Sequence, residues 1–450
     1  MNVVWKNWAR TVRSRPRAIH RPRSEADIQQ LIRDGSAAGQ RVKAVGSGHS
    51  PAPIAASDDA QLIDLSRMNR VVRIDRKAGE VTVEAGMRLE NLNELLAREG
   101  LALANLGSIS EQTVAGAVAT GTHGTGRMQP GLADMLTGLR LVTAGGECIQ
   151  VGANGTDAAT GGTRSKMSAG LELDAARVHL GLLGVLSQAS LRVTPAFRLH
   201  AIEETRPLDE VCARLDEFML EPYFRFWWFP WTDLARVWVA RPTELEPDPP
   251  RPAFQAYVQD SLLGNRMSEA LYACARSHPA AVRAVNRTVR RLLFTDRTER
   301  VDRSDRIFNF LIQVRQYVME YAIPIEHTAT ALHELKALIE RENFGAHVPV
   351  EVRFTPPARG WLDMAHDRAT CYIGVIMYKP FGADIRYREY FRAVDGMLRA
   401  YSGRPHWAKV HFRNREDLRG LYPRFDDFER VRKQLDPEGI FLNDYLRRFF

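Results

Sequence analysis

The sequence predicts a two-domain α+β protein, and three observations carry this prediction. The chain has 450 residues, 45% of them hydrophobic and 26% charged, which is ordinary globular composition for more than one domain. Strand and helix patterns alternate over the first 200 residues. After a boundary near 197–207, a second unit mixes strands and helices. We therefore expect domains at 15–200 and 201–420, followed by a tail at 421–450 with helix character.

Charge and composition exclude several classes of protein. The net charge is +8, but its 54 Arg and 8 Lys are spread along the chain and often stand beside Asp or Glu, which favours a solvated surface over a nucleic-acid or membrane-binding face. No run of eighteen apolar residues predicts a membrane span, and the N-terminus lacks a secretory signal pattern. Four cysteines without metal or redox spacing predict reduced thiols in a cytoplasmic protein; these are Cys148, Cys212, Cys274 and Cys371.

Local patterns predict the elements of each unit. In the first, Ser24 followed by Asp27 predicts an N-capped helix that ends near Gly35. RVKAV (41–45) and EVTVEAG (80–86) are expected strands, and the second leads into a helix ending at Gly100. For the second unit we expect helices at 265–295 and 327–343, and strands at 222–229, 348–355 and 370–378. Two stretches predict loops, at 151–170 and 246–254.

The hexapeptide GSGHSP (46–51) directly follows an expected strand. Its glycines let the backbone turn sharply and bring N–H groups close to a phosphate or a ring. The spacing matches neither a Rossmann fingerprint nor a P-loop. His49 at the tip of this turn could be a nucleophile, a ligand or an ordinary turn residue.

The stretch TVAGAVATGTHGTG (113–126) consists almost entirely of small and hydroxyl side chains. Such a segment exposes backbone donors and hydroxyls, which can wrap a diphosphate without lysine. The alternative is a flexible linker. Apolar residues within the stretch and structured flanks favour the anion-wrapping loop.

Two further segments carry charged side chains in an alternating pattern. VPVEVRFTP (348–356) places Glu351 and Arg353 on one strand face, either as a surface ion pair or as a carboxylate and guanidinium aimed at one ligand. RPHWAKVHF (404–412) places Lys409 in phase with Trp407, which a surface strand also explains. His406 and His411 lack a recognised metal spacing, and we predict no metal site.

The order of these segments resembles the flavin-binding domain of the vanillyl-alcohol-oxidase superfamily. GSGHSP, VTVEAG, NLGSI, TVAGAVATGTHGTG and AARVHLGLLGVL follow one another in the first half. The second half is similar to the aldonolactone oxidases, which include gulonolactone, galactonolactone and arabinonolactone oxidases. That similarity rests on YFRFWWFP, EYAIP, PVEVRF, RPHWAK and LDPEGIFLNDYL. It covers about 15–450 and is strongest to the gulonolactone oxidase branch.

The resemblance implies an FAD-binding domain at 15–200, a cap domain at 201–420, and a C-terminal tail that packs back on the FAD domain. It implies FAD linked covalently to His49 through the 8α-methyl group. Gly184 and Val185 would lie near the adenine end. The residues expected to hold the diphosphate and ribityl chain are Gly46, Ser47, Gly48, Ser50, Thr120, His123, Gly124, Thr125 and Gly126.

The resemblance also implies the catalytic groups. Glu351 would bind substrate hydroxyls and orient Arg353, while Arg353 and Lys409 would stabilise the negative charge that develops as a hydride leaves a carbinol carbon. Thr113 would complete the substrate pocket. Lys409 and His406 are both candidates for taking the hydroxyl proton, and the sequence leaves the choice open.

The resemblance implies oxidation of an aldono-1,4-lactone, with L-gulono-1,4-lactone expected first, to an ascorbate-type product. Gly107 in NLGSI favours dioxygen as acceptor, with hydrogen peroxide released, because a small residue leaves oxygen a path to the flavin. The alternatives are a lactone dehydrogenase with another acceptor and an alditol oxidase. We expect no nucleic-acid partner and a cytoplasmic protein, with peripheral membrane contact left open. A non-catalytic polyanion-binding protein is the rival from another class.

Overall fold

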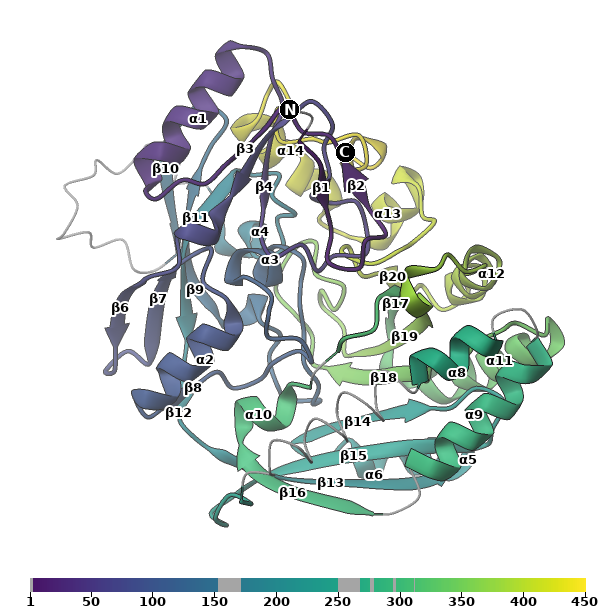
Figure 1. The fold of residues 1–450 in the computed structure, drawn as a ribbon. Coiled ribbons are helices and arrows are strands. Elements are labelled where there is room, and N and C mark those ends of the chain that lie inside the picture. Colours follow the sequence, from purple (N-terminus) through teal and green to yellow (C-terminus); the bar gives the residue numbers. More distant parts are fainter. Residues whose placement is uncertain (1–2, 153–170, 250–267, 276–278, 294–296, 311) are drawn as a thin grey trace.

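Two α+β domains form the molecule, which we describe from a computed structural model (Figure 1). The structure describes residues 3–152, 171–249, 268–275, 279–293, 297–310 and 312–450. The predicted loop at 151–170 lies outside these residues except at its first two positions, and the proline-rich loop at 246–254 is described only to 249.

The first domain contains two main sheets. A parallel sheet has the order β3-β5-β4, and an antiparallel sheet has the order β10-β9-β11-β7-β6. The strands are β3 (Ala18–His20), β4 (Val42–Val45), β5 (Gln61–Asp64), β6 (Val71–Asp75), β7 (Glu80–Glu84), β9 (Leu136–Val142), β10 (Cys148–Gly152) and β11 (Val185–Arg192). Two short pairs join β1 (Trp5–Lys6) to β2 (Arg13–Ser14) and β8 (Leu101–Ala102) to β12 (Thr194–Pro195). The helices are α1 (Glu25–Ala37), α2 (Leu89–Arg98), α3 (Val114–Ala119) and α4 (Leu173–Ala176).

The first helix begins as predicted and ends later than predicted. Ser24 and Asp27 form a capping box that satisfies the first free N–H groups of α1. Gly35 does not end the helix, because α1 continues to Ala37. A side chain at Gly35 would place its Cβ 2.8 Å from Cγ2 of Val42, so the glycine instead lets α1 pack closely against β4.

The second domain is built on one eight-stranded antiparallel sheet with the order β16-β13-β15-β14-β18-β19-β17-β20. The strands are β13 (Arg198–Pro207), β14 (Tyr223–Trp228), β15 (Leu234–Thr243), β16 (Thr298–Arg303), β17 (Gln316–Pro324), β18 (Val350–Thr355), β19 (Thr370–Tyr378) and β20 (Arg404–Pro405). The helices of this half are α5 (Leu208–Ala213), α6 (Leu215–Phe218), α8 (Ser268–Ala275), α9 (Pro279–Leu293), α10 (Ser304–Phe308), α11 (Thr328–Arg341) and α12 (Arg388–Arg399). The strands predicted at 222–229, 348–355 and 370–378 are confirmed, as is the helix at 327–343.

The two faces of this sheet pack against different parts of the molecule. On β18, Val350, Val352 and Phe354 pack into a core shared with α5, α11 and α12. The opposite face turns toward the first domain (Figure 1), where Tyr372 of β19 joins the other hydrophobic core. Because strand side chains alternate between faces, Glu351 and Arg353 point toward the first domain. The aromatic run at 223–230 forms the buried strand β14 of this sheet, as predicted.

The C-terminal segment contacts the first domain. It holds α13 (Arg415–Leu421) and α14 (Phe425–Leu435), whose apolar residues share a core with β4 and β9. The Asn443 side-chain amide donates hydrogen bonds to the carbonyls of Pro53, Ile54 and Ala56, at 2.6 to 3.2 Å. The end of the chain therefore holds the loop that follows the GSGHSP turn.

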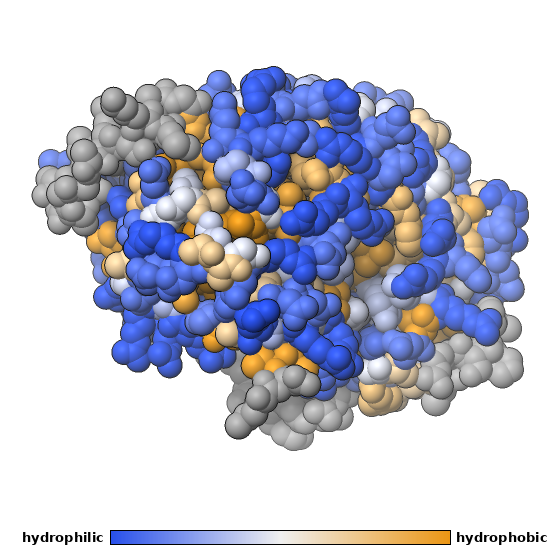
Figure 2. Space-filling model, turned by 90° about the horizontal axis from the view of Figure 1, so that it is seen from above, coloured by the Kyte–Doolittle hydropathy of each residue, from blue (hydrophilic) through white to orange (hydrophobic). Residues whose placement is uncertain are grey.

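The face of the molecule shown in Figure 2 is mostly hydrophilic, and hydrophobic side chains occupy small, separate areas on it. Arginines form ion pairs with nearby acids, as Arg241 does with Glu221, and such exposed pairs add little stability. Among the described residues, no helix is long and apolar enough to cross a membrane.

Candidate active site

A cavity opens beside the GSGHSP turn in the first domain. It lies between β4, the turn that follows it, α3 and the segment that leads into β11. Its wall includes eight of the residues predicted from the sequence to bind the cofactor or substrate: Gly46, Ser47, Gly48, His49, Ser50, Thr113, Thr120 and Gly184. The cavity is the candidate cofactor site.

Glycines shape the turn that forms this wall. At Gly46, a Cβ would collide with Oγ1 of Thr113, which caps the N-terminus of α3. At Gly48, φ is +72°, a left-handed conformation that favours glycine, and its carbonyl accepts a hydrogen bond from the Trp8 N–H at 2.8 Å. The backbone can therefore approach a bound ring or phosphate closely, as the sequence predicted.

His49 stands in the wall with one ring nitrogen unpaired. Its ring stacks on that of Trp8, with centroids 5.3 Å apart. Its Nδ1 is buried and has no hydrogen-bond partner among the residues that the structure describes. Burial lowers the pKa of His49, which favours the neutral imidazole with a free lone pair. The imidazole is thus suited to contact or bond a group that enters the cavity.

Two buried basic residues in the same wall have no counterpart in the sequence analysis. The Lys43 ammonium donates to the carbonyl of Phe441 at 3.1 Å, and burial lowers the pKa of Lys43 to about 7. His179 is 1% exposed, and its Nε2 lacks a hydrogen-bond partner in the described part of the chain. Both side chains line the cavity. Lys43 alternates with apolar residues on β4, a signal that was available in the sequence.

Glu351 and Arg353 form a buried ion pair on the cap sheet. Arg353 Nη2 lies 2.6 Å from Glu351 Oε1, and the two side chains are 6% and 14% exposed. Burial by itself raises the pKa of the Glu351 carboxyl, but Arg353 and Arg225 lower it below its usual value. The surface ion pair considered for this strand is therefore excluded. The pair belongs to an enclosed site.

Arg353 also reaches the first domain. Its Nη2 donates to Oγ of Ser108, and its Nη1 lies 3.5 Å from the carbonyl oxygen of His123. Its buried Nε has no partner within the described residues. Three of the five N–H donors of this guanidinium are thus paired within the described residues.

Arg225 and Ser108 complete this group and were missed by the sequence analysis. Arg225 on β14 lies beside Arg353 in the sheet register, and its Nη1 donates to Ser108 Oγ at 3.3 Å. Its guanidinium stacks on Trp227 and Trp238. Burial and the neighbouring Arg353 lower the pKa of Arg225 to about 9, so it stays charged at neutral pH. A single charge inside an aromatic strand was the available signal.

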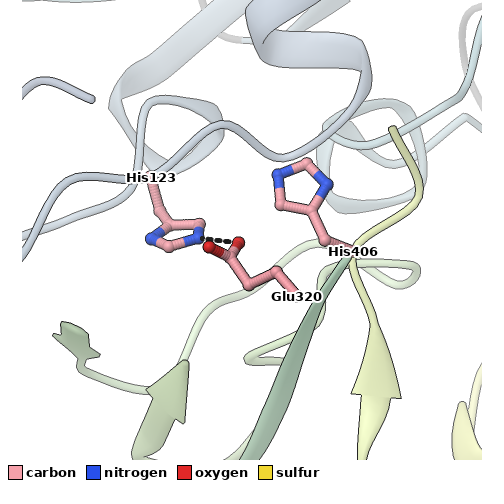
Figure 3. Close-up of side chains that lie close together, drawn as sticks. All are labelled: His123, Glu320 and His406. Atoms are coloured by element: carbon pink, nitrogen blue, oxygen red, sulfur yellow. Dashed lines mark hydrogen bonds and ion pairs between the residues drawn. The ribbon is translucent and has the colours of Figure 1, made fainter. Parts of the chain in front are cut away.

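A second buried carboxylate lies on β17, two strands from Glu351. Glu320 is 3% exposed, with Oε1 3.0 Å from Nε2 of His123 and Oε2 2.7 Å from Nζ of Lys409. Figure 3 shows its carboxylate beside the His123 ring, with the His406 ring near it. Burial by itself raises the pKa of Glu320, yet Lys409 and His123 hold it well below the usual value. Glu320 is therefore a carboxylate between cations.

Lys409 and His406 lie in a turn, not on a surface strand. β20 ends at Pro405, and the N–H of Lys409 donates to the carbonyl of His406 at 2.9 Å. Trp407 is buried, and its indole N–H donates to the carbonyl of Leu362 at 2.7 Å. Burial therefore explains the large apolar side chain at position 407. The surface strand considered for this segment is therefore excluded. The N–H of Ala52 donates to Ala408 at 2.9 Å, so the turn adjoins the loop that carries His49.

Several predicted site residues lie outside the cavity wall. Val185 is buried in β11. Gly107 precedes Ser108, and its carbonyl accepts from Asn309 at 2.7 Å. The segment His123, Gly124, Thr125 and Gly126 contacts the cap sheet: the N–H of Gly126 donates to Phe354 at 2.8 Å. This segment of the first domain therefore contacts the second domain beside Glu320. Thr113, which the sequence analysis places in the substrate pocket, lines the cavity beside Gly46, and its role there stays a prediction.

Comparison with known proteins agrees with this architecture. Residues 16–152 match the family model described as "FAD binding domain", and residues 189–449 match "D-arabinono-1,4-lactone oxidase". The chain is 38% identical over 449 residues to L-gulono-1,4-lactone dehydrogenase of Mycobacterium tuberculosis (strain H37Rv), covering 100% of this chain and 99% of that protein. It is 37% identical to L-gulonolactone oxidase of Bos taurus, covering 100% and 98%.

Solved structures show the same fold. A crystal structure of cholesterol oxidase from B. sterolicum superposes with a TM-score of 0.74 at 15% identity, covering 100% of this chain and 96% of that one. A solvent-stable cholesterol oxidase gives a TM-score of 0.76 at 16% identity, covering 99% and 97%. At this identity the likeness concerns the fold alone.

Fold and family models together define an FAD-dependent oxidoreductase of the vanillyl-alcohol-oxidase superfamily, with an FAD-binding domain and a large antiparallel cap domain. The chain belongs to the aldonolactone oxidase family. The resemblance, fold class and enzyme class predicted from the sequence are confirmed. The residues of the cavity wall fit FAD by their glycine turn and by His49, whose Nδ1 has no partner among the described residues.

Proposed function

We propose that this enzyme oxidises L-gulono-1,4-lactone to its 2-keto lactone, which enolises to an ascorbate-type product, and reduces dioxygen to hydrogen peroxide. The carbinol carbon loses a hydride and its hydroxyl loses a proton, and both hydrogens end in the hydrogen peroxide that is released. When bound, FAD supplies the acceptor of that hydride and passes the electron pair to dioxygen. The observation that carries the proposal is the buried Glu351–Arg353 pair, whose guanidinium reaches Ser108 and the carbonyl of His123 in the first domain.

The charges of the site suit this reaction. Arg353, Arg225 and Lys409 lie near two carboxylates, Glu351 and Glu320, all in or near the buried face of the cap sheet. Negative charge develops on the substrate oxygen as the hydride leaves. Preorganised cationic donors in a site shielded from water stabilise that charge more than they stabilise the ground state. In our proposal Arg353 and Lys409 are catalytic, and Glu351 binds substrate hydroxyls.

The hydrogen bonds of Lys409 and His406 limit which group can accept the hydroxyl proton of the substrate. Lys409 is held by Glu320 as an ammonium, which has no lone pair to accept a proton. His406 accepts the N–H of Ala408 at Nδ1, at 3.2 Å, so its other ring nitrogen carries the hydrogen of the neutral ring. Burial, followed by the charge of Lys409, lowers the pKa of His406 well below its usual value. In our proposal His406 contacts substrate as a donor.

We further propose that His49 holds FAD through a covalent bond from its imidazole to the 8α-methyl group. The free Nδ1 in the cavity wall supports this assignment. The absorption spectrum of the purified protein, recorded before and after acid precipitation, tests it. Flavin that stays with the pellet, and that His49→Ala releases to the supernatant, is the expected result. Flavin released from the unmodified protein would refute the covalent bond.

Dioxygen is the acceptor that Gly107 favours in this proposal. A Cβ at Gly107 would lie 3.2 Å from Cγ2 of Thr122 and 3.3 Å from the carbonyl oxygen of His123, so a methyl group would crowd the packing beside Arg353. The mycobacterial relative named as a dehydrogenase supports the alternative of another electron acceptor. The alditol oxidase remains a third candidate, tested with open-chain polyols.

Turnover measured under air decides between these candidates. We expect one hydrogen peroxide per lactone oxidised, with L-gulono-1,4-lactone preferred over open-chain alditols. Turnover that needs an added dye or cytochrome c, with little peroxide, would instead establish a dehydrogenase.

A further inference from the structure

Glu320 is a buried charged residue at the domain junction, and the proposed chemistry gives it no role of its own. It lies on β17, in a strand whose other side chains are buried and mostly apolar. In the sheet register, Glu351, Gly374 and Glu320 face one another across β18, β19 and β17. A Cβ at Gly374 would lie 3.3 Å from Oε2 of Glu320, so this glycine leaves space between the two carboxylates.

Each oxygen of Glu320 is committed to one cation. Oε2 contacts Lys409, on the turn that adjoins the His49 loop, at 2.7 Å. Oε1 contacts Nε2 of His123, on the segment that joins the domains, at 3.0 Å. The Nδ1 of His123 lies 3.1 Å from the carbonyl oxygen of Gly124. Because an ionised carboxylate can only accept, the Nε2 of His123 carries the hydrogen of this contact.

These contacts argue against a metal ion. The ligand atoms of His123, Glu320 and His406 lie within 4.8 Å of one another, close enough to hold a cation (Figure 3). However, a nitrogen that carries hydrogen cannot ligate, and Lys409 already occupies the second carboxylate oxygen. His406 uses Nδ1 to accept a backbone N–H. The cluster is therefore a set of ion pairs.

We propose that Glu320 is a positioning residue that holds Lys409 and His123 through its two carboxylate oxygens at the domain junction, so that the ammonium of Lys409 meets the reacting oxygen in a fixed place. The inference rests on the proposed function, because it assigns Glu320 to the same site. Glu320 acts through Lys409 and need not touch the substrate. The His123 ring in turn stacks on the ring of Tyr372, with centroids 3.6 Å apart.

A double-mutant cycle tests this assignment. Glu320→Gln, Lys409→Met and the combined variant are mixed anaerobically with L-gulono-1,4-lactone, and the rate of flavin bleaching and the lactone Kd are measured separately. We expect each single variant to bleach at least tenfold more slowly with Kd changed less than threefold. We expect the combined variant to match Lys409→Met alone, because both changes remove one shared function. Glu320→Asp, which keeps the charge, should recover part of the rate.

Two outcomes would overturn the assignment. One is a Glu320→Gln rate within threefold of the unmodified enzyme; the other is losses that multiply in the combined variant. If Glu320→Gln fails to fold, the assignment is tested by comparing Lys409→Met with the combined variant. The combined variant should still fold, because it has no unpaired ammonium. A combined rate tenfold below that of Lys409→Met would then overturn it.

Three controls separate this result from other causes. Glu299→Gln alters an exposed carboxylate that also contacts a histidine, His200, and should leave the bleaching rate unchanged. Enzyme treated with EDTA should keep its rate, and Zn²⁺ should not raise it; a metal-dependent rate would overturn the ion-pair assignment. Failure of every lactone to bleach the unmodified enzyme would refute the proposed function instead, and the cycle would then be run with whichever substrate bleaches it.

Discussion

Replacing Arg353 with methionine removes the guanidinium from the buried pair and keeps most of the side-chain volume. The number of donors at stake follows from the contacts of Arg353. Nη2 is committed to Glu351 and Ser108, and Nη1 to the carbonyl of His123. Two of the five N–H donors, one on Nε and one on Nη1, make no hydrogen bond among the described residues. In our proposal one of them meets the developing oxyanion, and its removal lowers the rate about 10²- to 10³-fold, or ~3–4 kcal/mol.

The assay is anaerobic flavin bleaching by L-gulono-1,4-lactone in stopped flow, with flavin content measured in the same samples. Arg241→Met is the matched control, because Arg241 forms an exposed pair with Glu221 on the same sheet. It should bleach at the unmodified rate. Arg353→Lys should fall between, since lysine keeps the charge but not the planar donor set.

Stability must be separated from chemistry in this experiment. Removing one partner of a buried ion pair costs about 3–5 kcal/mol, because the other charge stays buried. The combined variant Arg353→Met with Glu351→Gln carries neither charge and should fold and bind flavin while remaining slow. If Arg353→Met, with full flavin content, bleached within threefold of the unmodified enzyme, the assignment of Arg353 would be wrong.

Three further predictions concern the acceptor and stability. Gly107→Ala should slow reoxidation by dioxygen at least tenfold while anaerobic bleaching changes less than threefold, because the methyl crowds Thr122; equal slowing of both steps would contradict this. Burial lowers the pKa of His347 to about 4, so the folded state favours the neutral ring and its stability falls as pH drops from 6.5 toward 4. His347→Gln should remove ~3 kcal/mol of that fall in urea unfolding; an unchanged pH slope would refute it. Burial and the Asp134 carboxylate raise the pKa of Asp363 to about 7, so its charged form opposes folding above that pH. Asp363→Asn should therefore add up to ~4 kcal/mol to the free energy of unfolding at pH 8, and so raise Tm there, but leave both unchanged at pH 4. A lower Tm at pH 8 would exclude this.

The sequence contains the parts of the site that depend on local geometry. Alternation on β18 placed Glu351 and Arg353 on one face, and the glycines at 46 and 48 predicted the sharp turn beside the cavity. These predictions need only the two-residue period of a strand or the backbone freedom of glycine. Which face is buried was beyond that reasoning, because it depends on the docking of the first domain.

The parts that were missed depend on contacts between distant segments. Glu320 meets His123 from 197 residues away and Lys409 from 89 residues away, and sequence spacing carries no sign of either contact. Ser108 accepts from Arg353 across 245 residues. Gly35 looked like the end of a helix, yet close packing against Val42 explains it. A charge inside an apolar strand, as at Glu320 and Arg225, is the local signal that pointed to these groups.

The most direct test of the account is to mix the purified, flavin-containing protein with L-gulono-1,4-lactone in the absence of oxygen and to record the flavin absorbance. We predict that the yellow band bleaches within one turnover and returns when air is admitted, with hydrogen peroxide formed in proportion to the flavin. An absorbance unchanged by gulono-, galactono- and arabinono-1,4-lactones alike would contradict it.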